Sequence, residues 1–381
     1  MAPQPEGGIN PASLPVAGLR TIPSLDGVRA IAVSLVFFAH SGLENVVPGG
    51  LGVTIFFVLS GYLITTLMRG EYTQAGSINY PAFYLRRLLR LMPPLLVVSA
   101  AAWAMSALSV IGGAFSTGGL LSVLFYFGNY FVIAHDFHGL PAGLGVVWSL
   151  AVEEHYYIFY PPLALLLLRL GSARVAAITL SMLCAAILAW RCWLALRGVS
   201  PAYLSMATDA RVDAILVGCT MGLSYNPWLR QGQVGNGRWQ CLVGATCCVL
   251  LIGSLAYRNE FFRMTFRYTL QSLAIAPLLY LAIARSGHAA FRWLNSKPMT
   301  YLGSISYTIY LSHQLILYFI ERHWPSIGWA ATSAATALLT LAIAEPMRRW
   351  IEKPCAQLRG RLHKTITARR AKVRAVSMEA L

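Results

Sequence analysis

The sequence predicts an all-α integral membrane protein with about ten transmembrane helices and one further segment that enters the membrane without crossing it. Hydrophobic residues make up 57% of the chain and charged residues only 12%, about half of the share in an average soluble domain. The apolar residues also gather in blocks close to the roughly 20 residues that a helix needs to cross a bilayer. A soluble protein of this length would need a charged surface that this chain does not supply.

The predicted spans follow one another with short connections, and each is judged by its length and its lack of charge. They lie at about 28–45, 50–68, 92–112, 146–168, 175–195, 212–225, 239–257, 268–284, 300–320 and 328–347. One more apolar block, at 119–134, is short and contains Asn129. Hydrophobicity alone does not decide whether this block crosses.

The distribution of the 30 Lys and Arg residues decides it. If the block at 119–134 does not cross, most of these cations fall on the inner side, including the dense basic stretch that starts at Arg348. If it crossed, that stretch would face outward, against the positive-inside rule. We therefore expect both termini to be cytoplasmic and residues 114–145 to form a re-entrant or partly inserted segment on the outer side. Such backbone needs protein or water around it, which suggests a cavity.

The chain is expected to consist of a flexible cytoplasmic tail at 1–22, a membrane domain at 23–355 and a basic cytoplasmic tail at 356–381. The first tail is rich in Pro and Gly and does not resemble a secretory signal. Nucleic-acid binding is not expected despite the net charge of +16, because the cations lie between spans. The 7 cysteines form neither a disulfide framework nor a metal-binding pattern, so no metal is expected.

The first predicted span carries Arg29 and His40 on one face. The 11 positions between them amount to about three helical turns plus 20°. The rise is about 16 Å, roughly half of the hydrocarbon thickness. Arg29 is therefore expected near the cytoplasmic surface, and His40 is expected as a buried imidazole in the middle or outer half. A snorkelling arginine and a hydrogen-bonded core histidine are the structural alternatives.

A second basic feature precedes the span at 92–112. Arg87 and Arg90 are one helical turn apart, and Arg86 is adjacent. Guanidinium groups at the inner membrane edge suit bidentate binding of phosphates. A positive-inside cluster or a contact with anionic lipid is the alternative.

A third feature, at the start of the span at 146–168, reads Trp148 to Tyr157 and contains Glu153, Glu154 and His155. Adjacent helical residues point about 100° apart, so the two glutamates cannot both face one site. One is expected to act in catalysis and the other to pair with a cation, because unpaired carboxylates at membrane depth are costly.

Three later groups are weaker candidates. Asp209, Arg211 and Asp213 bracket a short segment and are interpreted first as an intramolecular ion pair. His313 lies within a predicted span as a site residue or an interhelical hydrogen-bonding residue. Glu345 is expected to pair with a cytoplasmic arginine. The motifs of soluble phosphate-binding, serine and zinc enzymes do not occur in the sequence.

These motifs, in this order and spacing, resemble the membrane acyltransferase 3 family of bacterial O-acyltransferases over about residues 22–355. The stretches that carry the resemblance include SLDGVRAIAVSLVFFAH at 24–40, GVTIFFVLSGYLI at 52–64, RRLLR at 86–90, WSLAVEEHYY at 148–157, RVDAILVG at 211–218, YLGSISYTIYLSH at 301–313 and EPMRRWIEKP at 345–354. The chain has His155 where the family commonly has Gln. Members often add a C-terminal hydrolase-like domain, and this chain is expected to be a stand-alone form.

The resemblance implies a multi-pass enzyme of the bacterial inner membrane with no bound cofactor. Its co-substrate would be cytoplasmic acyl-CoA, most commonly acetyl-CoA, and its acceptor a hydroxyl of an exopolysaccharide or lipid-linked glycan. His40 would act as general base or transient acyl carrier, oriented or recharged by Glu153 or Glu154, with Arg29 also in the catalytic set. Supporting roles would fall to Asp26, Trp148, His155, Arg211, Asp213, Tyr307, His313 and Glu345.

Alternatives from other classes remain open at this point. Some relatives acylate small molecules such as macrolides. A transporter or flippase would also suit many spans with buried charges and a broken segment. The acyl group is not determined by the sequence, nor is the presence of a homo-oligomer or a glycan-assembly partner.

Overall fold

The computed structural model describes residues 22–114, 116–170, 172–229 and 237–362. Helices and turns make up this part of the chain, with no β-strand in it, which confirms the all-α prediction. Most of the tail expected at 1–22, and the end of the tail expected at 356–381, lie outside the described residues.

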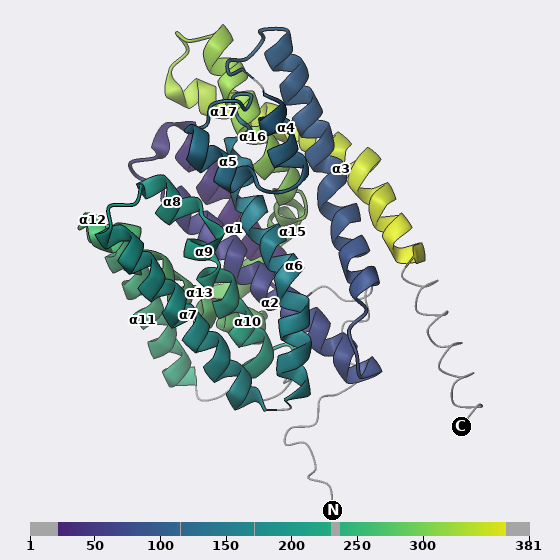
Figure 1. The fold of residues 1–381 in the computed structure, drawn as a ribbon, viewed down its shortest axis with the longest axis vertical. Helices are drawn as coiled ribbons and strands as arrows, with labels where there is room; N and C mark the ends of the chain where they lie inside the picture. Colours follow the sequence, from purple (N-terminus) through teal and green to yellow (C-terminus); the bar gives the residue numbers. More distant parts are fainter. Residues whose placement is uncertain (1–21, 115, 171, 230–236, 363–381) are drawn as a thin grey trace, which may run out of the picture.

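Two long helices and one short helix pack together in the middle of the molecule (Figure 1). They are α1 (Leu25–Phe38), α2 (Gly49–Ala75) and α10 (Asp213–Ser224). The helices α2 and α10 cross almost backbone to backbone, since a Cβ added to Gly61 would lie 1.9 Å from the Ile215 carbonyl oxygen. A Cβ added to Gly218 would likewise lie 2.1 Å from the Val58 carbonyl oxygen. Small residues at helix crossings are typical of membrane proteins.

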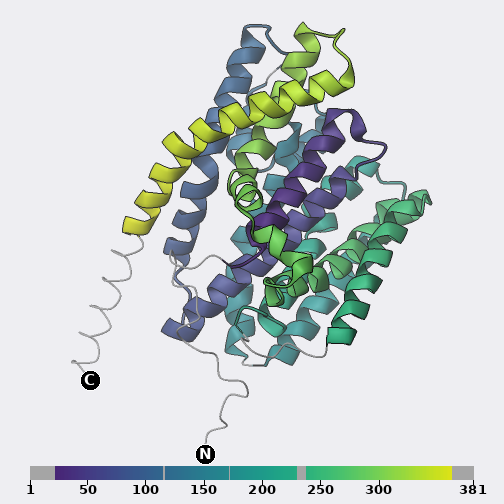
Figure 2. The same ribbon diagram turned by 180° about the vertical axis from the view of Figure 1, so that it is seen from behind.

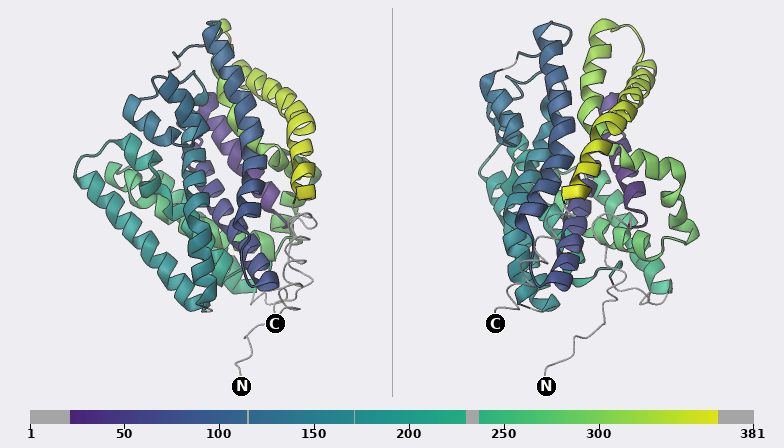
Figure 3. Two further views of the ribbon diagram at one scale, coloured as in Figure 1. Left: turned by 45° about the vertical axis from the view of Figure 1, so that its right-hand side comes forward. Right: turned by 90° about the vertical axis from the view of Figure 1, so that its right-hand side faces the viewer.

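The remaining helices surround this centre. On one side lie α7 (Ala173–Leu196), α11 (Gly237–Ala256), α12 (Glu260–Met264) and α13 (Phe266–Ala284). On the other side α3 (Tyr80–Ala107) runs beside the end of α17 (Trp329–Met347) and its π-helical extension Arg348–Glu352 (Figures 1 and 2). The left view in Figure 3 shows the same separation of these two groups. The other helices are α6 (Val147–Arg169), α8 (Pro201–Met206), α9 (Thr208–Arg211), α14 (Ala289–Arg292), α15 (Lys297–Ser304) and α16 (Ser306–His323), with short 3-10 helices at Leu144–Val146 and Trp293–Asn295.

Within the described residues, 7 helices are long and apolar enough to cross a membrane, fewer than the ten expected. They are Leu25–Leu43, Gly49–Ala75, Tyr80–Ala107, Ala173–Leu196, Gly237–Ala256, Phe266–Ala284 and Trp329–Leu362. The expected spans that do not qualify form α6, α10 and α16. The first carries two glutamates, the second has only 12 residues, and the third is broken from α15 at Ile305. All three are extensively buried in protein, so they need less apolar surface than a helix that faces lipid.

The block at 119–134 forms two separate helices, α4 (Thr117–Leu124) and α5 (Gly128–His135), of 8 residues each. A helix of this length extends only about 12 Å, well short of a bilayer. The buried side chain of Asn129 holds the start of α5 against the α8–α9 segment, since it donates to the Met206 carbonyl oxygen at 3.2 Å and to Thr208 Oγ1 at 3.0 Å.

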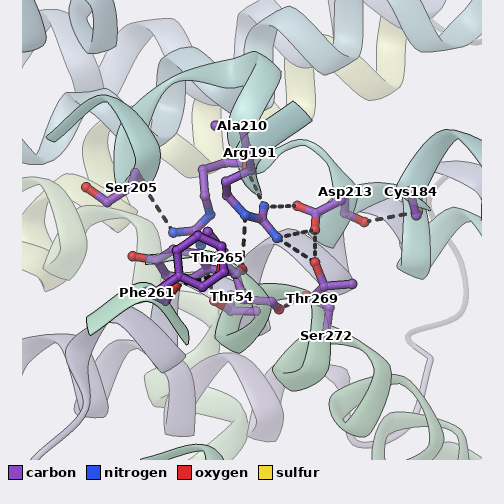
Figure 4. Close-up of polar contacts among 12 residues, drawn as sticks. Thr54, Cys184, Arg191, Ser205, Ala210, Asp213, Phe261, Thr265, Thr269 and Ser272 are labelled. Atoms are coloured by element: carbon purple, nitrogen blue, oxygen red, sulfur yellow. Dashed lines mark hydrogen bonds and ion pairs between the residues drawn. The ribbon is translucent and has the colours of Figure 1, made fainter. Parts of the chain in front are cut away.

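A buried ion pair joins α7 to α10 (Figure 4). The Asp213 carboxylate accepts from Arg191 Nη1 at 3.2 Å and from Nη2 at 3.1 Å, and both side chains are fully buried. Thr269 Oγ1 and the carbonyl oxygens of Ala210 and Thr265 also accept hydrogen bonds from the guanidinium. The sequence interpretation paired Asp213 with its neighbour Arg211, and this assignment was wrong. The partner of Asp213 comes from a distant helix, which spacing along the chain does not reveal.

Candidate functional site: two cavities that share a wall

The first cavity, called here the arginine cavity, lies between α1, α2, α3, α6 and α16. Its lining includes Arg29, Arg87 and Arg90. Glu153 and Tyr307 line it as well, so five residues singled out from the sequence meet in one space. They come from four helices, α1, α3, α6 and α16.

Arg29 projects from the second turn of α1 and is held in place by Asp26. Its Nη1 lies 2.8 Å from Asp26 Oδ1, one turn earlier on the same helix. Both side chains retain some exposure, 19% for Arg29 and 29% for Asp26. The pair therefore leaves the other guanidinium nitrogens of Arg29 available to the cavity, as bidentate anion binding requires.

The cluster on α3 divides into two parts. Arg87 and Arg90 line the arginine cavity, and neither has a carboxylate within ion-pair distance among the described residues. The Arg87 guanidinium lies over the Tyr157 ring at 5.4 Å from its centroid, which fixes its position by a cation–π contact. Arg86 instead forms an ion pair with Glu71 at 3.3 Å and does not line the cavity. The expectation that all three arginines share one site is corrected for Arg86.

The two adjacent glutamates occupy different surroundings, as their spacing requires. Glu153 faces the arginine cavity, where its carboxylate accepts from Ser60 Oγ at 3.1 Å and from Tyr157 at 3.2 Å. Glu154 does not line either cavity. The sequence analysis expected one of these glutamates to orient His40. Neither forms a hydrogen bond with His40 in the described structure, where the partner of His40 is His313.

The second cavity, called here the histidine cavity, lies at the other end of α1. It is lined by His40 together with Glu44, Trp148, Arg267 and Gln314. His40 belongs to the π-helical turn Ala39–Leu43, which follows α1 directly and contains Gly42 with a φ of 89°. His40 is an exposed residue, and the expectation of a buried imidazole was wrong.

His313, on α16, is the side chain that contacts His40. The distance from His40 Nδ1 to His313 Nε2 is 2.9 Å, and the two rings stack with centroids 5.1 Å apart. His313 is only 1% exposed. Sequence analysis singled out both histidines, but they are 273 positions apart and their pairing becomes visible only in the fold.

One wall separates the two cavities, since Val53 and Tyr310 line both. The Tyr310 hydroxyl lies 2.7 Å from Ser149 Oγ and 3.2 Å from the Val146 carbonyl oxygen. A buried hydroxyl with two partners is well held, so Tyr310 is a fixed part of the wall between the cavities in this conformation. Tyr310 and Ser149 were not predicted as site residues. The signal available for Tyr310 was its position one turn before His313.

The other predicted residues support the fold around the cavities and do not line them. His155 Nδ1 lies 2.7 Å from Thr208 Oγ1. Arg211 is buried, donates to the Ser205 carbonyl oxygen and to Thr54, and stacks on Tyr268 with its guanidinium 3.8 Å from the ring centroid. Glu345 pairs with Arg348 at 2.6 Å, as the sequence interpretation expected.

Comparison with known protein families shows to which family the chain belongs. A family model described as an acyltransferase domain matches residues 22–344. The chain belongs to this acyltransferase family. The match covers α1 to α17 up to Ala344, and thus every residue that lines the two cavities.

Curated relatives extend the likeness. The acyltransferase domain is 30% identical to the peptidoglycan O-acetyltransferase of Listeria monocytogenes, over 87% of this chain and 55% of that protein. It is 29% identical to a Bacillus subtilis protein provisionally assigned as a peptidoglycan O-acetyltransferase, over 88% of this chain and 55% of that protein. The acyltransferase thus spans about half the length of the curated relatives it matches. No solved structure gave a significant match.

Proposed function

We propose that this acyltransferase moves an acetyl group from acetyl-CoA to a hydroxyl of a cell-wall or cell-surface glycan. The observation that carries the proposal is the shared wall between a cavity lined by arginines and a cavity lined by an exposed histidine. A transferase that serves two membrane faces needs two such entrances and one reacting group between them. The names of the relatives support acetyl as the acyl group and a glycan as the acceptor.

The donor enters the arginine cavity in this mechanism. Arg87 and Arg90, which have no carboxylate partner in the described residues, bind phosphate oxygens of coenzyme A, and Arg29 extends this surface toward the thioester. The thioester arm then reaches the wall formed by Val53 and Tyr310. Rotation of Tyr310 away from Ser149 opens the path to His40.

The acceptor enters the histidine cavity, where Trp148 offers a flat apolar surface for a sugar ring. His40 takes the proton from the acceptor hydroxyl while the hydroxyl oxygen attacks the thioester carbonyl carbon. The carbon–sulfur bond breaks, and the coenzyme A sulfur leaves as a thiolate that receives this proton from His40. The products are the acetyl ester and coenzyme A thiol, and His40 returns to its neutral state.

The membrane arrangement in this proposal places the arginine cavity toward the cytoplasm, where acetyl-CoA is made, and the histidine cavity toward the outer face of the cytoplasmic membrane. The positive-inside distribution of Lys and Arg supports this orientation. Both termini are then cytoplasmic.

The test uses the full chain purified in detergent, with acetyl-CoA and isolated cell-wall glycan. Mass spectrometry of the glycan and release of free coenzyme A thiol measure transfer. The variant His40→Ala is expected to lower the rate by about 10²- to 10⁴-fold, the usual loss on removing a general base, while its yield and thermal stability stay normal. His323→Ala is the control, because this exposed histidine lies at the end of α16 and lines neither cavity. Wild-type transfer by a well-folded His40→Ala protein would refute the mechanism.

A further inference from the structure

The hydrogen bonds of His313 determine where its protons lie. Its Nδ1 is 3.1 Å from the Ile309 carbonyl oxygen and 2.8 Å from the Tyr310 carbonyl oxygen, both on its own helix. Carbonyl oxygens only accept hydrogen bonds. Nδ1 of His313 must therefore carry a proton, because a bare lone pair in this place would face two oxygens.

A second proton on His313 is strongly disfavoured. The side chain is 1% exposed, and the described residues place no carboxylate within ion-pair distance of it. An imidazolium there would be a buried cation without a partner, which is costly. His313 is therefore neutral, and its Nε2 carries a lone pair.

This lone pair faces His40. Nε2 of His313 lies 2.9 Å from Nδ1 of His40 and can only accept, so Nδ1 of His40 must donate. A neutral His40 with its proton on Nδ1 has its own lone pair on Nε2. That nitrogen has no hydrogen-bond partner in the described part of the chain, and His40, an exposed residue, lines the histidine cavity.

We propose that His313 is a positioning residue that holds His40 in the Nδ1-protonated tautomer, so that Nε2 of His40 is the atom that takes the acceptor proton. This inference rests on the proposed acetyl transfer. After proton transfer His40 carries protons on both nitrogens, and its Nδ1–H still donates to His313, which stabilises the new positive charge. His313 itself neither gains nor loses a proton in this cycle.

Two substitutions separate positioning from packing. The amide of His313→Gln reaches as far as the imidazole Nε2 and can still accept from His40. The shorter amide of His313→Asn reaches only as far as Nδ1, so it can donate to the helix carbonyls but leaves His40 without an acceptor. Both replacements are polar, neutral and smaller than histidine, which makes them a matched pair.

The first measurement reads the tautomer without any substrate. Protein with ¹⁵N-labelled histidine rings is prepared in detergent, and the His40 signals are assigned by their loss in His40→Gln. Two-bond ¹⁵N–¹H correlations are expected to show the proton on Nδ1 in the wild type and in His313→Gln. A mixture of tautomers is expected in His313→Asn. A wild-type His40 with its proton on Nε2 overturns the inference.

The second measurement is acetyl transfer from acetyl-CoA to isolated cell-wall glycan. His313→Asn is expected to lower kcat by roughly 10²-fold, the lower end of the loss on removing a general base, with an unchanged KM for acetyl-CoA. His313→Gln is expected to recover most of this loss. Equal kcat values for the two variants overturn the inference, and transfer by the wild type leaves the proposed function standing in that case. Absence of transfer by the wild type overturns the proposed function instead.

Discussion

The ion pair between Arg191 and Asp213 supplies a prediction about stability that is independent of catalysis. Both side chains are 0% exposed, and Asp213 accepts two hydrogen bonds from the guanidinium. The variant Asp213→Leu leaves Arg191 as a buried cation without a counter-ion. Breaking a buried pair from one side typically costs about 3–5 kcal/mol. At about 2 °C per kcal/mol, the value for larger domains, the melting temperature is expected to fall by about 6–10 °C.

The double variant Arg191→Met/Asp213→Leu is the decisive comparison. It removes both charges and fills the site with apolar side chains of similar size, which is often neutral or stabilising. We expect it to melt within a few degrees of the wild type and above Asp213→Leu. Glu345→Leu is the matched control, because its pair with Arg348 is 42% exposed on the glutamate side and such exposed pairs contribute little to stability.

The assay is thermal unfolding of the detergent-purified protein, followed by size-exclusion chromatography of the soluble fraction. The reasoning is refuted if Asp213→Leu melts no lower than Glu345→Leu. It is also refuted if the double variant loses at least as much stability as Arg191→Met and Asp213→Leu together, since coupled charges must show a favourable interaction energy.

Two further predictions concern the donor and the topology. Arg87→Glu is expected to raise the KM for acetyl-CoA at least tenfold, because one charge-assisted contact is lost and a repulsive one is added, whereas Arg86→Glu, outside the cavity, should change it little. If acetyl-transfer kinetics show the same change in this KM for both variants, donor binding by Arg87 is contradicted, and both arginines then serve only to set the membrane topology. In a cysteine-free protein, a single cysteine placed beside Arg258 should react with an impermeant maleimide in intact cells, and one placed beside Arg285 should not. Labelling at Arg285 alone would show that the orientation is opposite to the one proposed.

Much of the arginine cavity was predictable from the sequence. Arg29, Arg87 and Glu153 stand out because charged side chains within apolar segments are rare and usually face the protein interior. Helical spacing was enough to place Arg87 and Arg90 on one side of α3. The same reasoning failed for Arg86, because its partner Glu71 lies on another helix across a loop.

The pairing of side chains across the fold was not predictable. His40 and His313 were both candidates, yet their contact depends on how α16 packs beside the end of α1. The π-helical turn that exposes His40 leaves no mark in the hydrophobic pattern, since the residues of Ala39–Leu43 continue the apolar span. Only 7 of the described helices meet the length and composition of a membrane span, against the ten expected, because α6 carries two glutamates, α10 has 12 residues and α16 is broken from α15.

The short length of α10 has a consequence for biogenesis. A helix of 12 residues extends about 18 Å, so α10 is a poor substrate for independent partition into the bilayer during synthesis. Its glycine-lined crossing partner α2 is synthesised first, as is α1, the neighbour of α16. The amino-terminal helices therefore act as an internal chaperone for later ones. A substitution on the face of α2 that contacts α10 would cause failed insertion and proteolysis, although the catalytic residues of the chain are all intact.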